Sequence, residues 1–173
     1  MCYLYAEKYG MPITVIRSFN NYGPGMRLED GRVAADFARA VCENRDIEIF
    51  SDGTPTRSFC YVSDAAIGYL KCMLHASEGF ETYNIGAEGP ELSVFQFAGL
   101  FRGAGSELDG YTGEIRLAVN RDADYLKNNP NRRCPSIQKA RRKLGYCPSI
   151  LPQEGIRRYL KYLQESREES TTW

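Results

Sequence analysis

The stretch with the richest chemistry is residues 17–27, RSFNNYGPGMR. It follows the β-branched run at residues 13–16, which has the length and composition of a buried strand, and it contains a turn-forming Gly-Pro-Gly. In open α/β sheets, ligands bind beyond the carboxyl ends of the strands. Two side-chain amides, a phenol and two guanidinium groups at such a strand end suit a polar, anionic small molecule. The alternative is an ordinary strand followed by a loop.

Hydrophobic periodicity and turn residues predict the elements that position this stretch. Strands are expected at residues 13–19, 47–50, 58–62, 81–86 and 114–119, and helices at 1–9, 32–44, 93–103, 136–144 and from Pro152 onward. A further helix, capped by Ser63 or Asp64, carries Ile67, Leu70 and Leu74 on one face. Ser93 and Gln96 have the spacing of a capping box. Strands that alternate with helices define the α/β class.

Length and composition bound the class of protein. At 173 residues, 43% of them hydrophobic, the chain is long enough for one core and one or two domains. Its 22 basic and 22 acidic residues balance, so no global charge favours nucleic acid or an anionic membrane. No run approaches the length of a membrane span, and residues 1–5 lack the features of a secretion signal. We therefore expect a cytoplasmic protein with no nucleic-acid or membrane partner.

Six cysteines and one histidine limit metal and hydrolytic chemistry. The cysteines are scattered without a Cys-x-x-Cys pair, which argues against a zinc knuckle or a disulfide framework and fits reduced, mostly buried thiols. His75 lies near the predicted end of a helix, where a cation is favoured. We expect no metal site and no hydrolytic triad.

Five blocks of the sequence resemble the extended short-chain dehydrogenase/reductase family, the NAD-dependent sugar-nucleotide epimerases, dehydratases and decarboxylases. They are NNYGP at residues 20–24, FSDGTPTRSFCYVSD at 50–64, YNIG at 83–86, RCPSI at 133–137 and LGY at 144–146. They keep the family's order and spacing over nearly the whole chain. The first block looks like dTDP-glucose 4,6-dehydratases, and GRV at 31–33 looks like UDP-glucuronate decarboxylases.

The resemblance implies a fold and a domain organisation. Residues 1–165 would form the C-terminal, sugar-nucleotide-binding portion of a Rossmann-type enzyme, with the last strands of the sheet and a small α/β substrate domain. Residues 166–173 would form a polar tail. The family acts through oxidation at the sugar C4 by NAD.

Two family motifs are missing from the sequence. Dinucleotide binding needs a glycine-rich turn such as Gly-x-Gly-x-x-Gly, because the backbone must approach the pyrophosphate, and no such pattern occurs. The catalytic Tyr-x-x-x-Lys is also missing, since none of the 12 tyrosines has a lysine four positions later. We expect the N-terminal NAD-binding half to be absent from this chain. Alone, the chain should neither bind NAD nor transfer hydride, and a separate NAD-binding half or a second copy would be its partner.

The resemblance also implies residues that bind the substrate diphosphate. Asn20 is similar to an asparagine that binds the diphosphate or the sugar, and a neutral amide can donate to phosphate oxygens. Arg57 and Arg133 are similar to two arginines that bind the diphosphate, which a guanidinium can grip with two hydrogen bonds. The alternative for Asn20 is to hold its own loop, the role that we expect of Asn21. The alternative for the arginines is a solvated surface position.

Further candidates surround the expected base and cofactor. By resemblance, Phe50 packs near the uracil or thymine ring, and the backbone at Arg32 and Val33 contacts the base. Asn84 is similar to an asparagine near the nucleotide, and Ser18 lies where relatives approach the nicotinamide. A core position for Phe50 and a structural role for Asn84 at a strand end are the alternatives.

The sequence therefore predicts the substrate-binding part of an enzyme that acts on a UDP- or dTDP-sugar. No catalytic residue is assigned to this chain. The alternative is a non-catalytic sugar-nucleotide-binding or interaction module from a truncated or split gene, which the two missing motifs favour.

Overall fold

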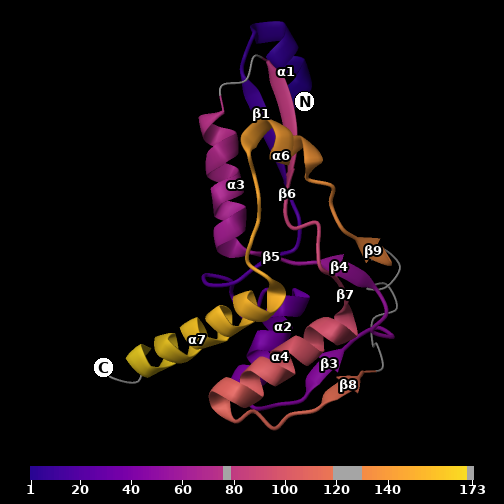
Figure 1. The fold of residues 1–173 in the computed structure, drawn as a ribbon, viewed down its shortest axis with the longest axis vertical. Coiled ribbons are helices and arrows are strands. Elements are labelled where there is room, and N and C mark those ends of the chain that lie inside the picture. Colours follow the sequence, from indigo (N-terminus) through magenta and orange to yellow (C-terminus); the bar gives the residue numbers. More distant parts are fainter. Residues whose placement is uncertain (76–78, 119–129, 171–173) are drawn as a thin grey trace.

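The computed structural model describes residues 1–75, 79–118 and 130–170 as an elongated chain with two regions (Figure 1). The first region is built on the parallel strands β1 (Ile13–Ser18) and β6 (Phe80–Ile85). The helices α1 (Cys2–Tyr9), α3 (Val62–Leu74) and α6 (Gln138–Leu144) pack against this pair. The carboxyl ends of both strands point toward the second region (Figure 1).

The second region is a layered α/β unit with the larger core. It contains α2 (Val33–Cys42), the parallel strands β3 (Ile47–Ile49) and β8 (Ile115–Leu117), α4 (Val94–Asp109) and α7 (Pro152–Ser170). The hydrophobic periodicity that predicted its helices is confirmed, because the core includes Phe37 of α2, Phe97 and Phe101 of α4, and Ile156 and Tyr159 of α7. The predicted capping box is also present, with Ser93 and Gln96 bonded reciprocally at 3.0 and 2.8 Å.

Two small sheets connect the regions. One has the order β7 (Glu91–Ser93), β4 (Thr56–Ser58), β9 (Arg132–Arg133), and the other pairs β2 (Asn21–Tyr22) with β5 (Cys60–Tyr61). Three of these strands were not predicted, because two or three residues are too few for a periodic signal. The single strand predicted at residues 58–62 is wrong: the chain breaks at Phe59, changes sheet, and starts α3 at Val62.

Several predicted helix ends are wrong because distant residues decide them. α4 continues to Asp109 rather than ending near Gly103. Neither Ser63 nor Asp64 caps α3: Tyr61 is its N-cap, and the buried carboxylate of Asp64 instead accepts backbone N–H groups from another segment.

The last two helices differ from their predicted bounds in the same way. α6 begins at Gln138 rather than at residue 136, and the N–H of Ile137 donates to the carboxylate of Glu88 at 3.1 Å. α7 runs through residues 166–170 of the polar tail predicted at 166–173, and residues 171–173 lie outside the described residues. Arg167 of this extension donates a hydrogen bond to the backbone oxygen of Cys42 at the end of α2.

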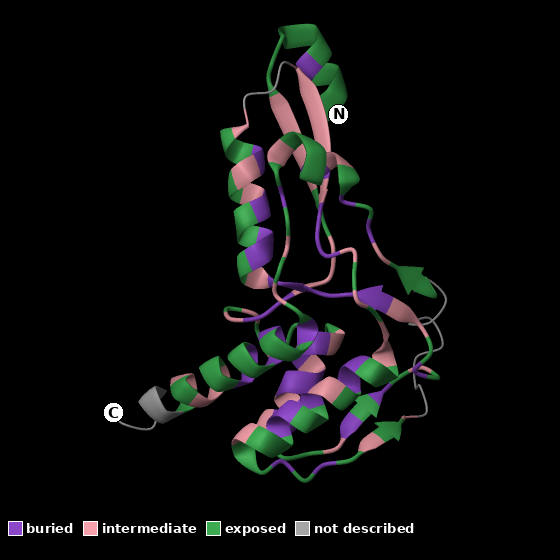
Figure 2. Ribbon diagram, in the orientation of Figure 1, coloured by how far each residue is buried: buried purple, intermediate pink, exposed green. Residues whose placement is uncertain are grey.

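An apolar surface lies on the first region. Ile67, Leu70 and Leu74 do share one face of α3, but they are 48%, 53% and 78% exposed. The ribbon of α3 accordingly carries exposed stretches along its length (Figure 2). In the same region, α1 also has exposed tyrosines and the exposed Leu4. Within the described ranges, β1 pairs only with β6, so its second edge has no strand partner.

Two further expectations concern the burial of the thiols and the presence of membrane-spanning helices. The cysteines are free thiols, but only Cys60 and Cys72 are fully buried, so the prediction of mostly buried thiols is wrong. Cys2 and Cys147 are exposed. Across the residues that the structure describes, none of the helices is both long enough and apolar enough to cross a lipid bilayer.

Candidate functional site

A cavity of about 360 Å³ lies where the second region meets the small sheets, between the loop after β1, the N-terminus of α2, the end of β3, and strands β4 and β9. Six residues predicted to bind substrate line it: Asn20, Arg32, Val33, Phe50, Arg57 and Arg133. Residues separated by more than 100 positions in the sequence thus share one cavity.

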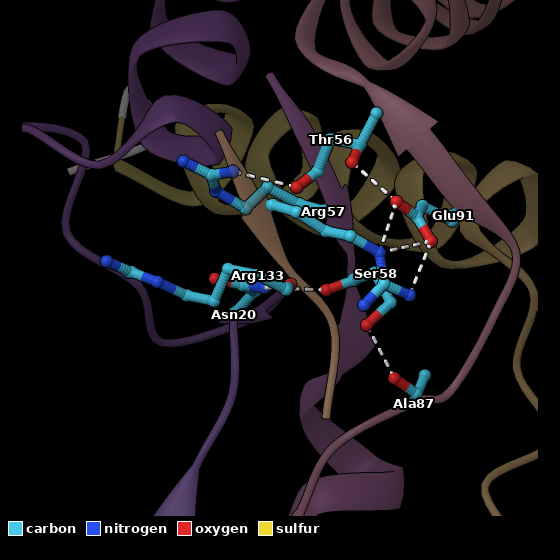
Figure 3. Close-up of polar contacts among 8 residues, drawn as sticks. Asn20, Thr56, Arg57, Ser58, Ala87, Glu91 and Arg133 are labelled. Carbon is cyan, nitrogen blue, oxygen red and sulfur yellow. Dashed lines mark hydrogen bonds and ion pairs between the residues drawn. The ribbon is translucent and has the colours of Figure 1, made fainter. Parts of the chain in front are cut away.

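The basic side of the cavity is formed by Arg57 and Arg133. They are paired directly opposite each other in the parallel strands β4 and β9. Arg57 is only 6% exposed, and its Nη1 donates to the backbone oxygen of Thr56 at 2.7 Å, whereas Arg133 is exposed (Figure 3). A buried guanidinium that lines a cavity favours an anionic ligand, because burial strengthens its interaction with a negative charge.

Asn20 ties the three segments of this basic side together. Its backbone is in the left-handed region, at φ 44°, and its Nδ2 donates to the backbone oxygens of Ser58 at 2.8 Å and Arg133 at 3.2 Å (Figure 3). Both amide protons are therefore used by the protein itself. These hydrogen bonds favour the loop-holding role that was the alternative for Asn20, although the side chain also lines the cavity.

The N-terminus of α2 closes a second side of the cavity. Residues 31–34 line it, and Arg32 is the N-cap without a side-chain capping bond. The first turn of a helix presents N–H groups without helical partners and the positive end of the dipole, which favours an anion. The guanidinium of Arg32 itself pairs with Asp30 on the surface. Burial raises the pKa of Asp36 in this turn; Arg39 opposes the shift and Asp30 adds to it.

The remaining side of the cavity is apolar. Phe50 is 40% exposed at the end of β3, so the structure rejects the core position that was its alternative. Val33 of α2 lies on the same cavity. The prediction missed several other lining residues: Asn21, Met26, Asp36, Glu48, Ile49, Ser51, Pro55, Phe59 and Val94. Asn21, Met26, Ser51, Pro55 and Phe59 lie in the stretch 17–27 or in the block 50–64, but no local pattern assigns them to a cavity whose elements meet only in the fold.

Two predicted site residues lie outside this cavity. Asn84 on β6 donates to the backbone oxygen of Ser136 at 3.0 Å, which is the structural role named as its alternative. The hydroxyl of Ser18 hydrogen-bonds that of Tyr69 at 2.8 Å. The same Tyr69 hydroxyl accepts Nδ2 of Asn21 at 2.5 Å, so Asn21, expected as a loop residue, is a β2 residue held at the cavity by α3.

Known proteins resemble this chain in sequence and in fold. A sequence model of the NAD dependent epimerase/dehydratase family matches residues 1–86. UDP-glucuronic acid decarboxylase 1 of Xenopus tropicalis is 33% identical over 168 residues, which are 97% of this chain and 37% of that protein. The chain is thus similar to the NAD-dependent epimerase/dehydratase family through residues 1–86, and to this decarboxylase over nearly its whole length. The chain spans well under half the length of that relative.

Solved structures confirm the Rossmann-type α/β fold. A UDP-glucose 4-epimerase from Thermotoga maritima, solved with UDP-glucose, is 28% identical with a TM-score of 0.81 over 95% of this chain and 50% of that one. A UDP-glucuronic acid 4-epimerase from Bacillus cereus, solved with UDP-glucuronic acid and NAD, has a TM-score of 0.79 over 95% of this chain and 49% of that one. It is 22% identical and supports the fold alone.

The lining of the cavity offers groups that bind anions and planar rings. Two guanidinium groups and a helix N-terminus can hold a polyanion, and Phe50 can flank a planar ring. The part of the chain that the structure describes has no group of three metal-binding side chains. The residues also do not fit an NAD cradle by themselves, because no glycine-rich turn for a pyrophosphate occurs in the sequence.

Proposed function

We propose that this chain is the substrate-binding part of an NAD-dependent sugar-nucleotide epimerase, dehydratase or decarboxylase, and that its ligand is a UDP- or dTDP-sugar. The observation that carries the proposal is the pairing of buried Arg57 with Arg133 in one cavity beside the N-terminus of α2. The two guanidinium groups and the helix N-terminus together suit a ligand with two phosphate groups better than a ligand with a single negative charge.

The roles of the individual residues follow from their places in the cavity. Arg57 and Arg133 bind the diphosphate and neutralise its charge, and the α2 backbone at Arg32 and Val33 adds N–H donors. Phe50 flanks the base. Bound in this way, the sugar is held in a fixed orientation, which lowers the entropic part of the barrier for a reaction at C4.

The redox step belongs to residues outside this chain. NAD, when held by a dinucleotide-binding half, supplies oxidation at C4, and this chain presents the sugar to it. Asn84 and Ser18, at or near the carboxyl ends of β6 and β1, lie on the side of the first region that faces the cavity region. Alone, the chain has no turnover.

A titration of the full chain tests the proposal. Calorimetry with UDP, dTDP and NAD should detect binding of UDP or dTDP but not of NAD. Arg57→Ala should lower UDP affinity about tenfold or more, since a lost charged hydrogen bond is worth roughly 1.5–3 kcal/mol. Arg102→Ala, which removes a surface arginine paired with Glu114, is the matched control. If UDP and dTDP both fail to bind the folded chain, the proposal is wrong.

The second candidate is a non-catalytic sugar-nucleotide-binding or interaction module. The exposed apolar face of α3, and the edge of β1 that has no strand partner among the described residues, favour a partner for the first region. The partner that we propose is a dinucleotide-binding half or a second copy of this chain. Mixing the chain with the NAD-binding half of a relative distinguishes the two functions. If the chain is the substrate-binding part of an enzyme, the mixture should turn over a UDP-sugar, whereas a non-catalytic module should give no turnover.

A further inference from the structure

The sheet β7-β4-β9 sorts its side chains onto two faces. In the pairing of β4 with β9, Arg57 is opposite Arg133 and Thr56 is opposite Arg132. Successive residues of a strand point to opposite faces, so the two cavity arginines share one face and Thr56 shares the other with Arg132. Figure 3 shows Arg57 and Arg133 extending to one side, with Glu91 on the other. The sheet therefore separates the cavity from a second polar cluster.

The two arginines that line the cavity repel each other across the sheet. Arg57 and Arg133 are like charges directly opposite each other, an arrangement that destabilises strand pairing. β9 has only two residues, and the N–H of Thr56 joins β4 to its start by a hydrogen bond of 2.7 Å to the oxygen of Asn131. So short a strand contributes little stability of its own. Further contacts must hold the pair in place.

Glu91 supplies such a contact across all three strands. It belongs to β7, is paired with Ser58 of β4, and accepts a hydrogen bond from the Thr56 hydroxyl. Its Oε2 lies 2.8 Å from Nη2 of Arg132 and its Oε1 lies 3.0 Å from Nε, so this contact with β9 is bidentate. Arg132 above all, and then Thr56, lowers the pKa of Glu91 to about 2. Bidentate charged pairs fix orientation as well as contributing energy.

We propose that Glu91 is a positioning residue for the diphosphate site. By holding Arg132 and Thr56 on one face of the sheet, it sets the spacing of Arg57 and Arg133 on the other. The two guanidinium groups then bind both phosphates of one ligand, whose charge relieves their repulsion. The inference rests on the proposed function and deepens it: Glu91 never touches the ligand, yet it makes the site selective for nucleoside diphosphates over nucleosides.

Ligand titrations on the full chain separate this role from a general loss of structure. Glu91→Gln should weaken UDP binding about tenfold and leave uridine binding unchanged, because only the diphosphate contacts the arginine pair. A merely destabilised fold would weaken both ligands. In an Arg133→Ala background, Glu91→Gln should weaken UDP no further. Glu81→Gln is the matched control, since that carboxylate also forms ion pairs, with Lys139 and Lys143, but lies on β6.

Amide hydrogen exchange tests the positioning without a ligand. Glu91→Gln should accelerate exchange at Thr56 and leave the β1–β6 amides unchanged. Normal protection at Thr56, or equal weakening of UDP and uridine, would overturn the inference even where the wild-type chain binds UDP. If the wild-type chain binds no UDP, the proposed function fails, and with it the selectivity part of the inference. The exchange rate still decides whether Glu91 holds β9.

Discussion

Asp64 and Ile150 are 86 positions apart in the sequence, yet Oδ2 of Asp64 accepts the backbone N–H of Ile150 at 2.8 Å. The same oxygen accepts the N–H of Ser149 at 3.0 Å. Asp64 is 5% exposed in the first turn of α3, and its two partners precede α7. One buried carboxylate thus joins the two regions of the molecule.

These two hydrogen bonds make Asp64 important for the stability of the fold. Asp64→Ala would leave two backbone N–H groups without their acceptor, and each such group costs about 1–3 kcal/mol. We expect the free energy of unfolding to fall by about 2–4 kcal/mol in urea titrations. Ser63→Ala, at the exposed neighbouring position, should change it by less than about 0.5 kcal/mol. Equal stabilities of the two variants would contradict this account.

Two glycines of α4 should respond oppositely to alanine. A Cβ on Gly105 would lie 2.6 Å from Cγ1 of Val41, so Gly105→Ala forces α2 and α4 apart and should cost about 1–3 kcal/mol of stability. A Cβ on Gly103 meets nothing within 4 Å. Gly103→Ala should therefore stabilise by up to about 1 kcal/mol through helix propensity. Thermal unfolding of both variants checks the opposite signs.

Acid should destabilise the fold through two carboxylates. Glu81, held first by Lys139 and then by Lys143, and Glu91, held by Arg132, each have a pKa lowered from 4.5 to about 2. A carboxyl with a lower pKa in the folded state stabilises it above the unfolded pKa and loses this effect as the pH falls through the folded pKa. We expect stability to fall from about pH 5 toward pH 2.

Urea titrations at a series of pH values measure this effect. The Glu81→Gln/Glu91→Gln variant should show a flatter profile than the wild-type chain over that range. High salt should also flatten the wild-type profile, since both carboxylates are near the surface and salt screens their ion pairs. A variant whose profile matches that of the wild type would assign the acid sensitivity to other groups.

The cysteines should divide by reactivity with a thiol reagent at pH 8. Burial raises the pKa of Cys60 to about 11, against the opposing hydrogen bond from Tyr146. Cys2 and Cys147 are exposed and should react first, whereas Cys60 and Cys72 should react only after unfolding. Cys147→Ser should remove one rapidly reacting thiol. Modification of Cys60 in the native chain would contradict its burial.

The apolar face of α3 predicts self-association. Leu70 is 53% exposed among other apolar side chains of α3, and the chain alone should form dimers or aggregates in sedimentation experiments. Leu70→Glu should reduce this association without loss of stability, because the side chain is not in the core. Leu151→Glu, at an apolar position that is 58% exposed ahead of α7, is the control and should not. A monodisperse wild-type monomer would be inconsistent with this prediction.

Local patterns in the sequence were sufficient to predict the large helices. Phe97 and Phe101 of α4 and Tyr159 of α7 are buried where helical spacing predicted, because one apolar stripe per helix suffices to orient it against a core. The blocks around Arg57 and Arg133 were also enough to nominate both residues for one site. Each of these features depends only on residues that are close together in the sequence.

Only the tertiary structure decided how the site is held together. The opposition of Arg57 to Arg133, the use of both Asn20 amide protons by backbone oxygens, and the contact of Glu91 with Arg132 each join segments more than 30 residues apart. Such contacts depend on strand register and on elements two or three residues long, which leave no periodic signal. The sequence by itself determined which groups are available, and packing between distant segments determined which of them meet.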